Sequence, residues 1–177
     1  MNNINVEYYK SPVGELILGE YKGEICLCDW RYRKMRAAID QRIQNGLGAK
    51  YVERDTSVVD DVIKQLDSYF TGELEIFDLP FHLVGTPFQQ NVWRELIKIP
   101  FGKTDSYLGL SRKLNKEKAV RAVASANGAN AISIIVPCHR IIGSKGELVG
   151  YAGGLPVKKK LLQIESKNKY PEQMRLF

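Results

Sequence analysis

A thiol and an imidazole stand side by side in the run Ile135-Val136-Pro137-Cys138-His139-Arg140. A cysteine thiol has a pKa of about 8.5 and becomes a nucleophile at neutral pH only beside a base or a positive field. Histidine is the side chain best suited to be that base. Neighbours on a strand point to opposite faces, so contact between Cys138 and His139 requires a turn or a bridging water. The pair alone also fits a buried cysteine beside a hydrogen-bonded histidine.

The residues around Cys138 predict the elements that position it. The apolar run Ile132–Val136 indicates a buried strand leading straight into Cys138. Before it, apolar spacing predicts two short helices, over residues 107–114 and 116–126, in the proportions of a helix-turn-helix.

Capping signals predict two more helices, one on each side. Thr86-Pro87 has the cap and first-position proline of a helix that Pro100 ends. Pro156 begins a final helix that runs to about Glu165, and the charged tail after Ser166 is expected to fray.

The first third of the chain predicts a small, mainly β module. Residues 14–19 and 24–28 have the composition of strands and form a hairpin through residues 20–23. Residues 31–54 are polar and basic, and we expect a mixture of helix and loop there. Ser57 is the expected cap of a helix that Gly72 ends, and the stretch from Phe77 to Gly85 is expected to be a linker.

The composition is that of a soluble globular protein. Of 177 residues, 44% are hydrophobic and 26% charged, which excludes a disordered chain, and the net charge of +6 suits a polyanionic partner. No apolar stretch approaches the roughly 20 residues that span a bilayer, and no leader opens the chain. We therefore expect no membrane contact and a cytoplasmic address, or a nuclear one in a eukaryote.

Three cysteines are an odd count, which argues against a disulfide framework. Cys26 and Cys28 share one face of a predicted strand. Structural zinc usually takes four ligands, and the nearest histidine is His82. We therefore expect two core cysteines and no metal.

An ordered set of motifs resembles the O6-alkylguanine-DNA alkyltransferase family. The matches are densest from Gly85 to Glu165 and include Ile99-Pro100-Phe101-Gly102, Arg121-Ala122-Val123, the run around Cys138, and Gly150-Tyr151-Ala152-Gly153-Gly154. One four-residue motif arises by chance, whereas this series does not. The N-terminal module is similar only through Tyr69-Phe70-Thr71-Gly72 and Phe77-Asp78-Leu79-Pro80.

The resemblance implies an α+β fold in two domains. Residues 1–80 would form a β-rich α/β domain of the RNase H-like kind. Residues 81–177 would form a mostly helical DNA-binding and alkyl-acceptor domain, with a helix-turn-helix of the winged-helix type. The family resemblance also implies a monomer without a cofactor.

The same resemblance implies direct-reversal DNA repair in a single turnover. Cys138 would take the alkyl group from O6-alkylguanine in double-stranded DNA and keep it as a thioether, with O4-alkylthymine left open as a second substrate. His139 would deprotonate Cys138 through a water, and Glu165 would hold the imidazolium, as a carboxylate behind an imidazole does. Tyr107 would donate a proton or hydrogen bond to the departing guanine. Asn130 would hold the helix-turn-helix against the active site.

The resemblance also implies a substrate pocket and a DNA-contacting surface. The backbone N–H of Ala152 would bind the guanine oxygen, and Tyr151, Gly153 and Ile141 would line the pocket. Because the alkylated oxygen lies inside the stacked duplex, the base must be flipped out, and Arg121 would fill its place from the minor groove. The other expected DNA contacts are Ser106, Ala122, Ala124, Ser125, Asn127 and Gly128.

Taken singly, these residues have ordinary structural interpretations. Glu165 resembles a solvated charge at a helix end, Tyr107 a core residue, and the glycine cluster a turn. The small residues beside Arg121 are equally typical of a packed alanine-rich helix. Their order in one chain favours the functional interpretation.

Three other function classes are alternatives to alkyl transfer. A cysteine hydrolase would use Cys138 and His139 with Glu165 or Asn130 as the orienting residue, but explains neither Arg121 nor the helix-turn-helix. A non-catalytic lesion-binding relative would lack the acceptor cysteine. A plain DNA-binding regulator would bind particular bases and not react.

Overall fold

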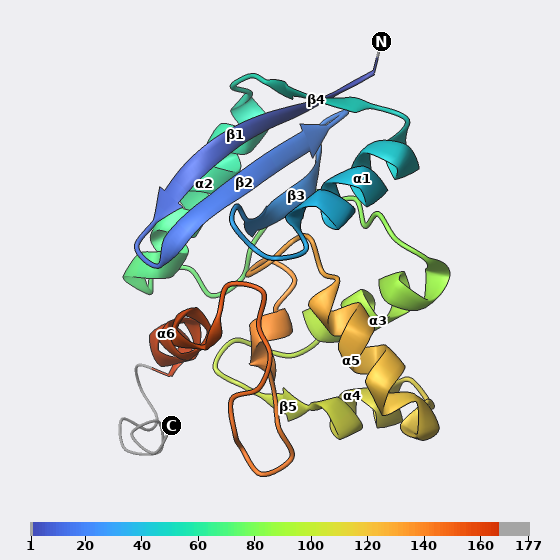
Figure 1. Ribbon diagram of the computed structural model, residues 1–177. Coiled ribbons are helices and arrows are strands. Elements are labelled where there is room, and N and C mark those ends of the chain that lie inside the picture. Colours follow the sequence, from blue (N-terminus) through green and yellow to red (C-terminus); the bar gives the residue numbers. More distant parts are fainter. Residues whose placement is uncertain (1, 167–177) are drawn as a thin grey trace. The chain divides into compact units, whose positions relative to one another are not determined.

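The computed structural model describes residues 2–166, which pack into two compact units (Figure 1). The first unit consists of residues 2–86 and 131–135, and the second of residues 87–130 and 136–166. The domain boundary expected after residue 80 stays a prediction, and the return of residues 131–135 to the first unit was not foreseen. The tail expected to fray lies outside the described residues. None of the helices within residues 2–166 is long and apolar enough to cross a membrane.

A four-stranded sheet forms the centre of the first unit. The predicted hairpin is confirmed as β2 (Gly14–Tyr21) and β3 (Glu24–Trp30), and two strands that were not predicted extend it, β1 (Asn3–Ser11) and β4 (Lys50–Glu53). The strand order is β3-β2-β1-β4, with β4 parallel to β1 and the other pairs antiparallel. Along the first half of β1, buried Ile4 and Val6 alternate with more exposed residues, as in a strand with one face in the core and the other less buried.

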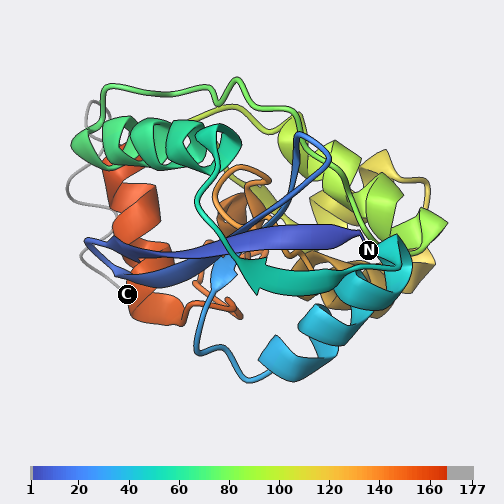
Figure 2. The same cartoon turned by 90° about the horizontal axis from the view of Figure 1, so that it is seen from above.

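Two helices cover opposite faces of this sheet, which Figure 2 shows edge-on: α1 (Arg36–Leu47) and α2 (Ser57–Thr71). Ile39 and Ile43 of α1 belong to one core cluster with Ile4 and Val6. The predicted cap of α2 was one residue late, because Thr56 Oγ1 accepts the hydrogen bond from the Val59 amide at 3.2 Å. The predicted end at Gly72 is confirmed, and that residue adopts a left-handed φ of 80°.

The second unit is mostly helical. Its longer helices are α3 (Pro87–Ile97), α4 (Tyr107–Lys113), α5 (Val120–Gly128) and α6 (Leu155–Glu165). Its shorter elements are β5 (Asp105–Ser106), η1 (Glu117–Ala119), η2 (Cys138–Arg140) and β6 (Ile141–Ile142), where η marks a 3-10 turn. The helix-turn-helix is confirmed as α4, η1 and α5, with Asn115 at a positive φ of 56° between the helices. Trp93 Nε1 donates to Ala126 O at 2.8 Å and ties α3 to α5.

The strand predicted over residues 132–136 is wrong, although its burial was predicted correctly. The segment makes an isolated parallel bridge between Cys28 and Ile132 and then turns. Ile134 has a φ of 72°, which is incompatible with an extended backbone. An apolar run reports burial more reliably than conformation. Cys138 and His139 therefore lie on the 3-10 turn η2, and not on opposite faces of a strand.

Candidate active site

Cys138 opens the turn η2 and is almost buried, with 4% of its surface exposed. Its amide donates to Val136 O at 2.8 Å, and it forms no disulfide. Asn130 Nδ2 donates to the same Val136 carbonyl at 2.9 Å. Asn130, which follows α5 in the chain, thus fixes the backbone just before Cys138.

His139 follows Cys138 and is completely buried. Its Nε2 lies 2.6 Å from Glu165 Oε1, while Nδ1 has no hydrogen-bond partner among the described residues. Burial lowers the pKa of His139 from its ordinary 6.5 despite the carboxylate, and the charges of Arg140 and Lys158 lower it further. The lowered pKa favours the neutral imidazole, in which Nε2 faces Glu165 and Nδ1 can serve as an acceptor.

Glu165, at the end of α6, is 6% exposed, and its carboxylate is held from two sides. Arg140 Nε donates to Oε2 at 2.9 Å and Arg140 Nη2 to Oε1 at 3.0 Å, which is a two-pronged contact. Burial alone would raise the Glu165 pKa, but the hydrogen bonds from His139 and Arg140 and the positive charge of Arg140 lower it to about 2. Arg140 also donates to Ile99 O at 2.6 Å. Sequence reasoning gave Arg140 no role.

Lys158 is a second residue to which the sequence analysis assigned no role. It is completely buried on α6, and its ammonium donates to the backbone carbonyls of Ile141, Val149 and Gly150. Burial lowers its pKa to about 8, while the charge of Cys138 opposes that shift. A signal was present in the sequence. Lys158, Leu161, Leu162 and Glu165 have the i, i+3, i+4, i+7 spacing of a buried helix stripe, and two of the four are charged.

The expected pocket residues come from three parts of the second unit. Tyr107 begins α4 and donates to Val149 O at 3.2 Å, and its pKa is raised by burial and by the charge of Cys138. The Tyr151 ring lies edge-on to the His139 ring, 6.4 Å between centroids. Ala152 and Gly153 form the half-buried turn that follows Tyr151, and Ile141 in β6 is completely buried.

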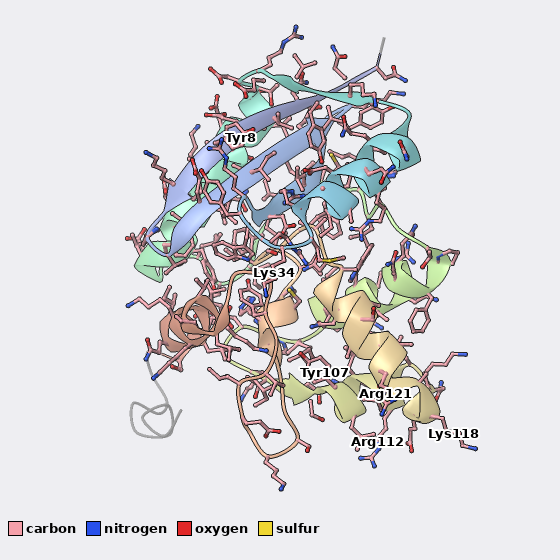
Figure 3. The ribbon with its side chains drawn as sticks, viewed as in Figure 1. Tyr8, Lys34, Tyr107, Arg112, Lys118 and Arg121 are labelled. Carbon is pink, nitrogen blue, oxygen red and sulfur yellow. The ribbon has the colours of Figure 1, made fainter. Side chains whose placement is uncertain are left out.

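The helix-turn-helix carries a basic, exposed end, where Figure 3 shows Arg112, Lys118 and Arg121 side chains from α4, η1 and α5. On α5 the exposed residues are Arg121, Ala122, Ser125 and Gly128, with Ala124 half-buried. Asn127, expected to contact DNA, is only 5% exposed and packs inside. Ser106 is the cap of α4, because its Oγ accepts from the Gly109 amide at 2.9 Å.

Cys26 and Cys28 are buried in β3, and burial raises the pKa of both thiols. Across residues 2–166, no three His, Cys, Asp or Glu side chains are grouped so as to hold a metal ion.

Known proteins share this fold and sequence over nearly the whole chain. Residues 4–83 match the family described as 6-O-methylguanine DNA methyltransferase, ribonuclease-like domain, and residues 87–167 match its DNA binding domain. A methylated-DNA–protein-cysteine methyltransferase of Methanosarcina barkeri is 39% identical over 159 residues, which are 90% of this chain and 95% of that protein. The Mycobacterium leprae protein of the same name is 41% identical, covering 88% of each chain. The chain belongs to the methylated-DNA–protein-cysteine methyltransferase family.

Solved structures of such methyltransferases agree with this assignment. The crystal structure of Mycobacterium tuberculosis OGT in complex with DNA has a TM-score of 0.79 and 33% identity, over 98% of this chain and 99% of that one. An O6-methylguanine-DNA methyltransferase from Pyrococcus kodakaraensis has a TM-score of 0.66 at 23% identity, which shows the fold. The expected α+β architecture, a ribonuclease-like unit followed by a helical DNA-binding unit, is confirmed.

Proposed function

We propose that this protein repairs DNA by direct reversal, transferring the alkyl group of O6-alkylguanine to Sγ of Cys138. The observation that carries the proposal is the buried chain of contacts behind that thiol in a member of the methyltransferase family. His139 is held at 2.6 Å by Glu165, and Arg140 holds Glu165 in turn. Because its substrate would be DNA, we expect the protein to act in the cytoplasm, or in the nucleus of a eukaryote. We also expect it to act as a monomer.

In this mechanism neutral His139 is the base. Its Nε2 proton is directed at Glu165, so Nδ1 accepts the Cys138 proton through an intervening water, and the carboxylate stabilises the imidazolium. The thiolate attacks the alkyl carbon in line, a carbon–sulfur bond forms, and the carbon–oxygen bond to guanine breaks with its electron pair on the base. Tyr107, now bonded to Val149 O, would turn its hydroxyl to the departing guanine and supply a proton. The thioether is not hydrolysed, so one molecule repairs one lesion.

Guanine and its surroundings would be held by the remaining residues. The Ala152 amide would bind the guanine oxygen, with Tyr151, Gly153 and Ile141 around the base. Arg121, Ala122, Ser125 and Gly128 lie on the exposed side of α5, where small side chains allow a helix to approach the minor groove closely. O4-alkylthymine would be a second substrate if its smaller ring is retained by the same contacts.

Intact-protein mass spectrometry after incubation with an O6-methylguanine duplex tests the proposal. We expect each molecule to gain one methyl group, located on Cys138 by peptide mapping, and then to be inactive. Cys138→Ala is expected to bind the same duplex and never react. Methyl release over many turnovers would indicate a hydrolase, and an unchanged mass would indicate a binding protein. Either result would overturn the proposal.

Replacing Arg121 with alanine is expected to slow transfer from duplex DNA by about ten- to a hundredfold. Flipping the base costs a few kcal/mol of stacking and pairing, and about 1.4 kcal/mol corresponds to each factor of ten. Transfer from free O6-methylguanine base needs no flipping, so its rate should not change. The matched control is Arg112→Ala on α4, which removes an exposed positive charge paired with Glu117 at 3.4 Å. If Arg121→Ala slows the free-base reaction equally, Arg121 does not act in flipping.

A further inference from the structure

The chain passes through the first unit just before it reaches the turn η2, which carries Cys138. The chain leaves the second unit after Asn130, spends residues 131–135 in the first unit, and returns at Val136, two residues before Cys138. The two ends of this excursion are joined by the 2.9 Å bond from Asn130 Nδ2 to Val136 O. Residues 131–135 therefore form a loop whose two ends, Asn130 and Val136, are held together. The position of these ends determines where the turn η2 begins, and hence where Cys138 lies.

The loop is fastened to β3 by its backbone. The Cys28 amide donates to Ala131 O at 2.9 Å, and the Ser133 amide donates to Cys28 O at 2.6 Å. These bonds flank the parallel bridge between Cys28 and Ile132. Residues 131–133 therefore pair briefly with β3 at the edge of the sheet. No local sequence pattern predicts this pairing.

The same loop is also held by a side-chain hydrogen bond, from Ser133 to the buried carboxylate of Asp29. Ser133 Oγ donates to Asp29 Oδ1 at 3.1 Å, and both residues are completely buried. Asp29 also accepts from Arg33 Nη1, at 3.1 and 3.0 Å, and from Arg36 Nη1 at 3.0 Å. Arg36 is itself held by Asp40. An ionised carboxylate is stable in the interior only with such partners.

Backbone strain lies between this anchor and Cys138. Ile134 is β-branched and has a φ of 72°, a left-handed conformation that such a residue adopts only when its surroundings hold it there. Ser133 on one side is bonded to Asp29, and Val136 on the other is bonded to Asn130. Loss of the hydrogen bond between Ser133 and Asp29 would let the backbone of Ile134 relax. This relaxation would shift the residues that follow, including Val136 and Cys138.

We propose that Asp29 and Ser133 are positioning residues for alkyl transfer, which act by holding the 131–135 loop and hence the place of Cys138. The inference rests on the proposed function, because it concerns the same thiol. In-line displacement depends steeply on placement, and a shift of about 1 Å costs up to roughly a hundredfold in rate. Neither residue touches the substrate or the reacting atoms.

The test is the variant Ser133→Ala in full-length protein. It removes one hydroxyl and leaves Asp29 with both arginines, so the buried charge stays paired. With protein in excess over an O6-methylguanine duplex, we expect the single-turnover transfer rate to fall about tenfold. The dissociation constant of Cys138→Ala/Ser133→Ala for that duplex should equal that of Cys138→Ala within about twofold. The reaction with free O6-methylguanine should slow by the same factor as the duplex reaction.

Tyr9→Phe is the matched control. It also removes one hydroxyl from the first unit, the one that donates to Asp67 at 2.5 Å, but that bond joins β1 to α2, far in sequence from the loop. Its transfer rate should match the wild type even where its melting temperature falls. Arg33→Lys is the second variant; it keeps the positive charge but loses the double contact with Asp29, and a smaller reduction in rate is expected.

The outcomes separate the two claims. If wild-type protein gains no methyl group on Cys138, the proposed function fails. If the wild type reacts and Ser133→Ala reacts at the same rate, only the positioning role fails. Equal slowing by Ser133→Ala and Tyr9→Phe, or weaker DNA binding with an unchanged rate, would also overturn it. Should Ser133→Ala not fold, an Arg33→Lys variant that folds and reacts at the wild-type rate would equally overturn the positioning role.

Discussion

His139→Gln is expected to slow alkyl transfer by about two to four orders of magnitude, the usual contribution of a general base. Glutamine still fills the buried space and can hydrogen bond to Glu165, but it cannot accept the Cys138 proton. The dissociation constant for lesion DNA should be unchanged, because His139 is completely buried and contacts Glu165. Single-turnover rates with an O6-methylguanine duplex measure the effect.

The pH dependence of the rate identifies the cause. In the wild type the rate should fall in acid only below the ordinary histidine pKa of 6.5, since burial lowers the pKa of His139 and keeps it neutral down to more acidic solution. In His139→Gln the rate should instead rise about tenfold per pH unit through neutrality, because only spontaneously formed thiolate reacts. The control is His82→Gln, which changes the other histidine of the chain, a half-exposed residue 3.4 Å from Glu24. A wild-type pH profile in His139→Gln would refute the assignment of the base.

The helices of the second unit could be predicted because their signals are local. Thr86-Pro87 marks the start of α3, and Asn115 separates the helices of the helix-turn-helix with a left-handed φ that asparagine tolerates. The end of α6 at about Glu165 was also predicted, but the burial of Glu165 was not, because a charged residue at a helix end is usually solvated. Each of these signals lies within a few residues of the feature that it predicts.

The missed features depend on partners far away in the chain. Strand β4 is short, KYVE, and becomes a strand only by pairing in parallel with β1. Ser133 and Asp29 are 104 residues apart, so no sequence window contains both. Arg140 was visible inside the Cys138 motif, but its partner Glu165 is 25 residues away, and the choice of ion-pair partner is made by packing. The resemblance implied the order of the expected catalytic residues, and the structure shows the contacts that hold them in place.

Arg140→Met is expected to lower the free energy of unfolding by about 3–5 kcal/mol, the cost of breaking a buried ion pair from one side. Glu165 would keep the His139 contact but lose two charged hydrogen bonds, and Ile99 O would lose its donor. Urea denaturation measures the loss. The comparison is Lys98→Met, which breaks an exposed pair with Glu95 and should cost less than about 1 kcal/mol.

Low pH should reduce the difference in free energy of unfolding between the wild type and Arg140→Met. The folded-state pKa of Glu165 is about 2 and its ordinary value 4.5, so its ionised form contributes stability above pH 4.5 that is lost as the pH falls from 4.5 toward 2. Without Arg140 the folded-state pKa is less depressed, and this contribution is smaller at every pH above that window. Wild type and Arg140→Met should therefore differ most in stability near neutral pH and converge in acid, where Glu165 is protonated in both.

A double-mutant cycle separates the pair from its parts. In Arg140→Met/Glu165→Gln no buried charge is left alone, so the double variant should lose less stability than the two single variants together, by about 0.5–3 kcal/mol. Activity gives an independent readout: Arg140 lowers the pKa of His139, so in Arg140→Met that pKa rises and the acid limb of the rate profile moves to higher pH. Additive stability losses, together with an unmoved acid limb, would mean that Arg140 neither pairs with Glu165 in solution nor sets the protonation of the base.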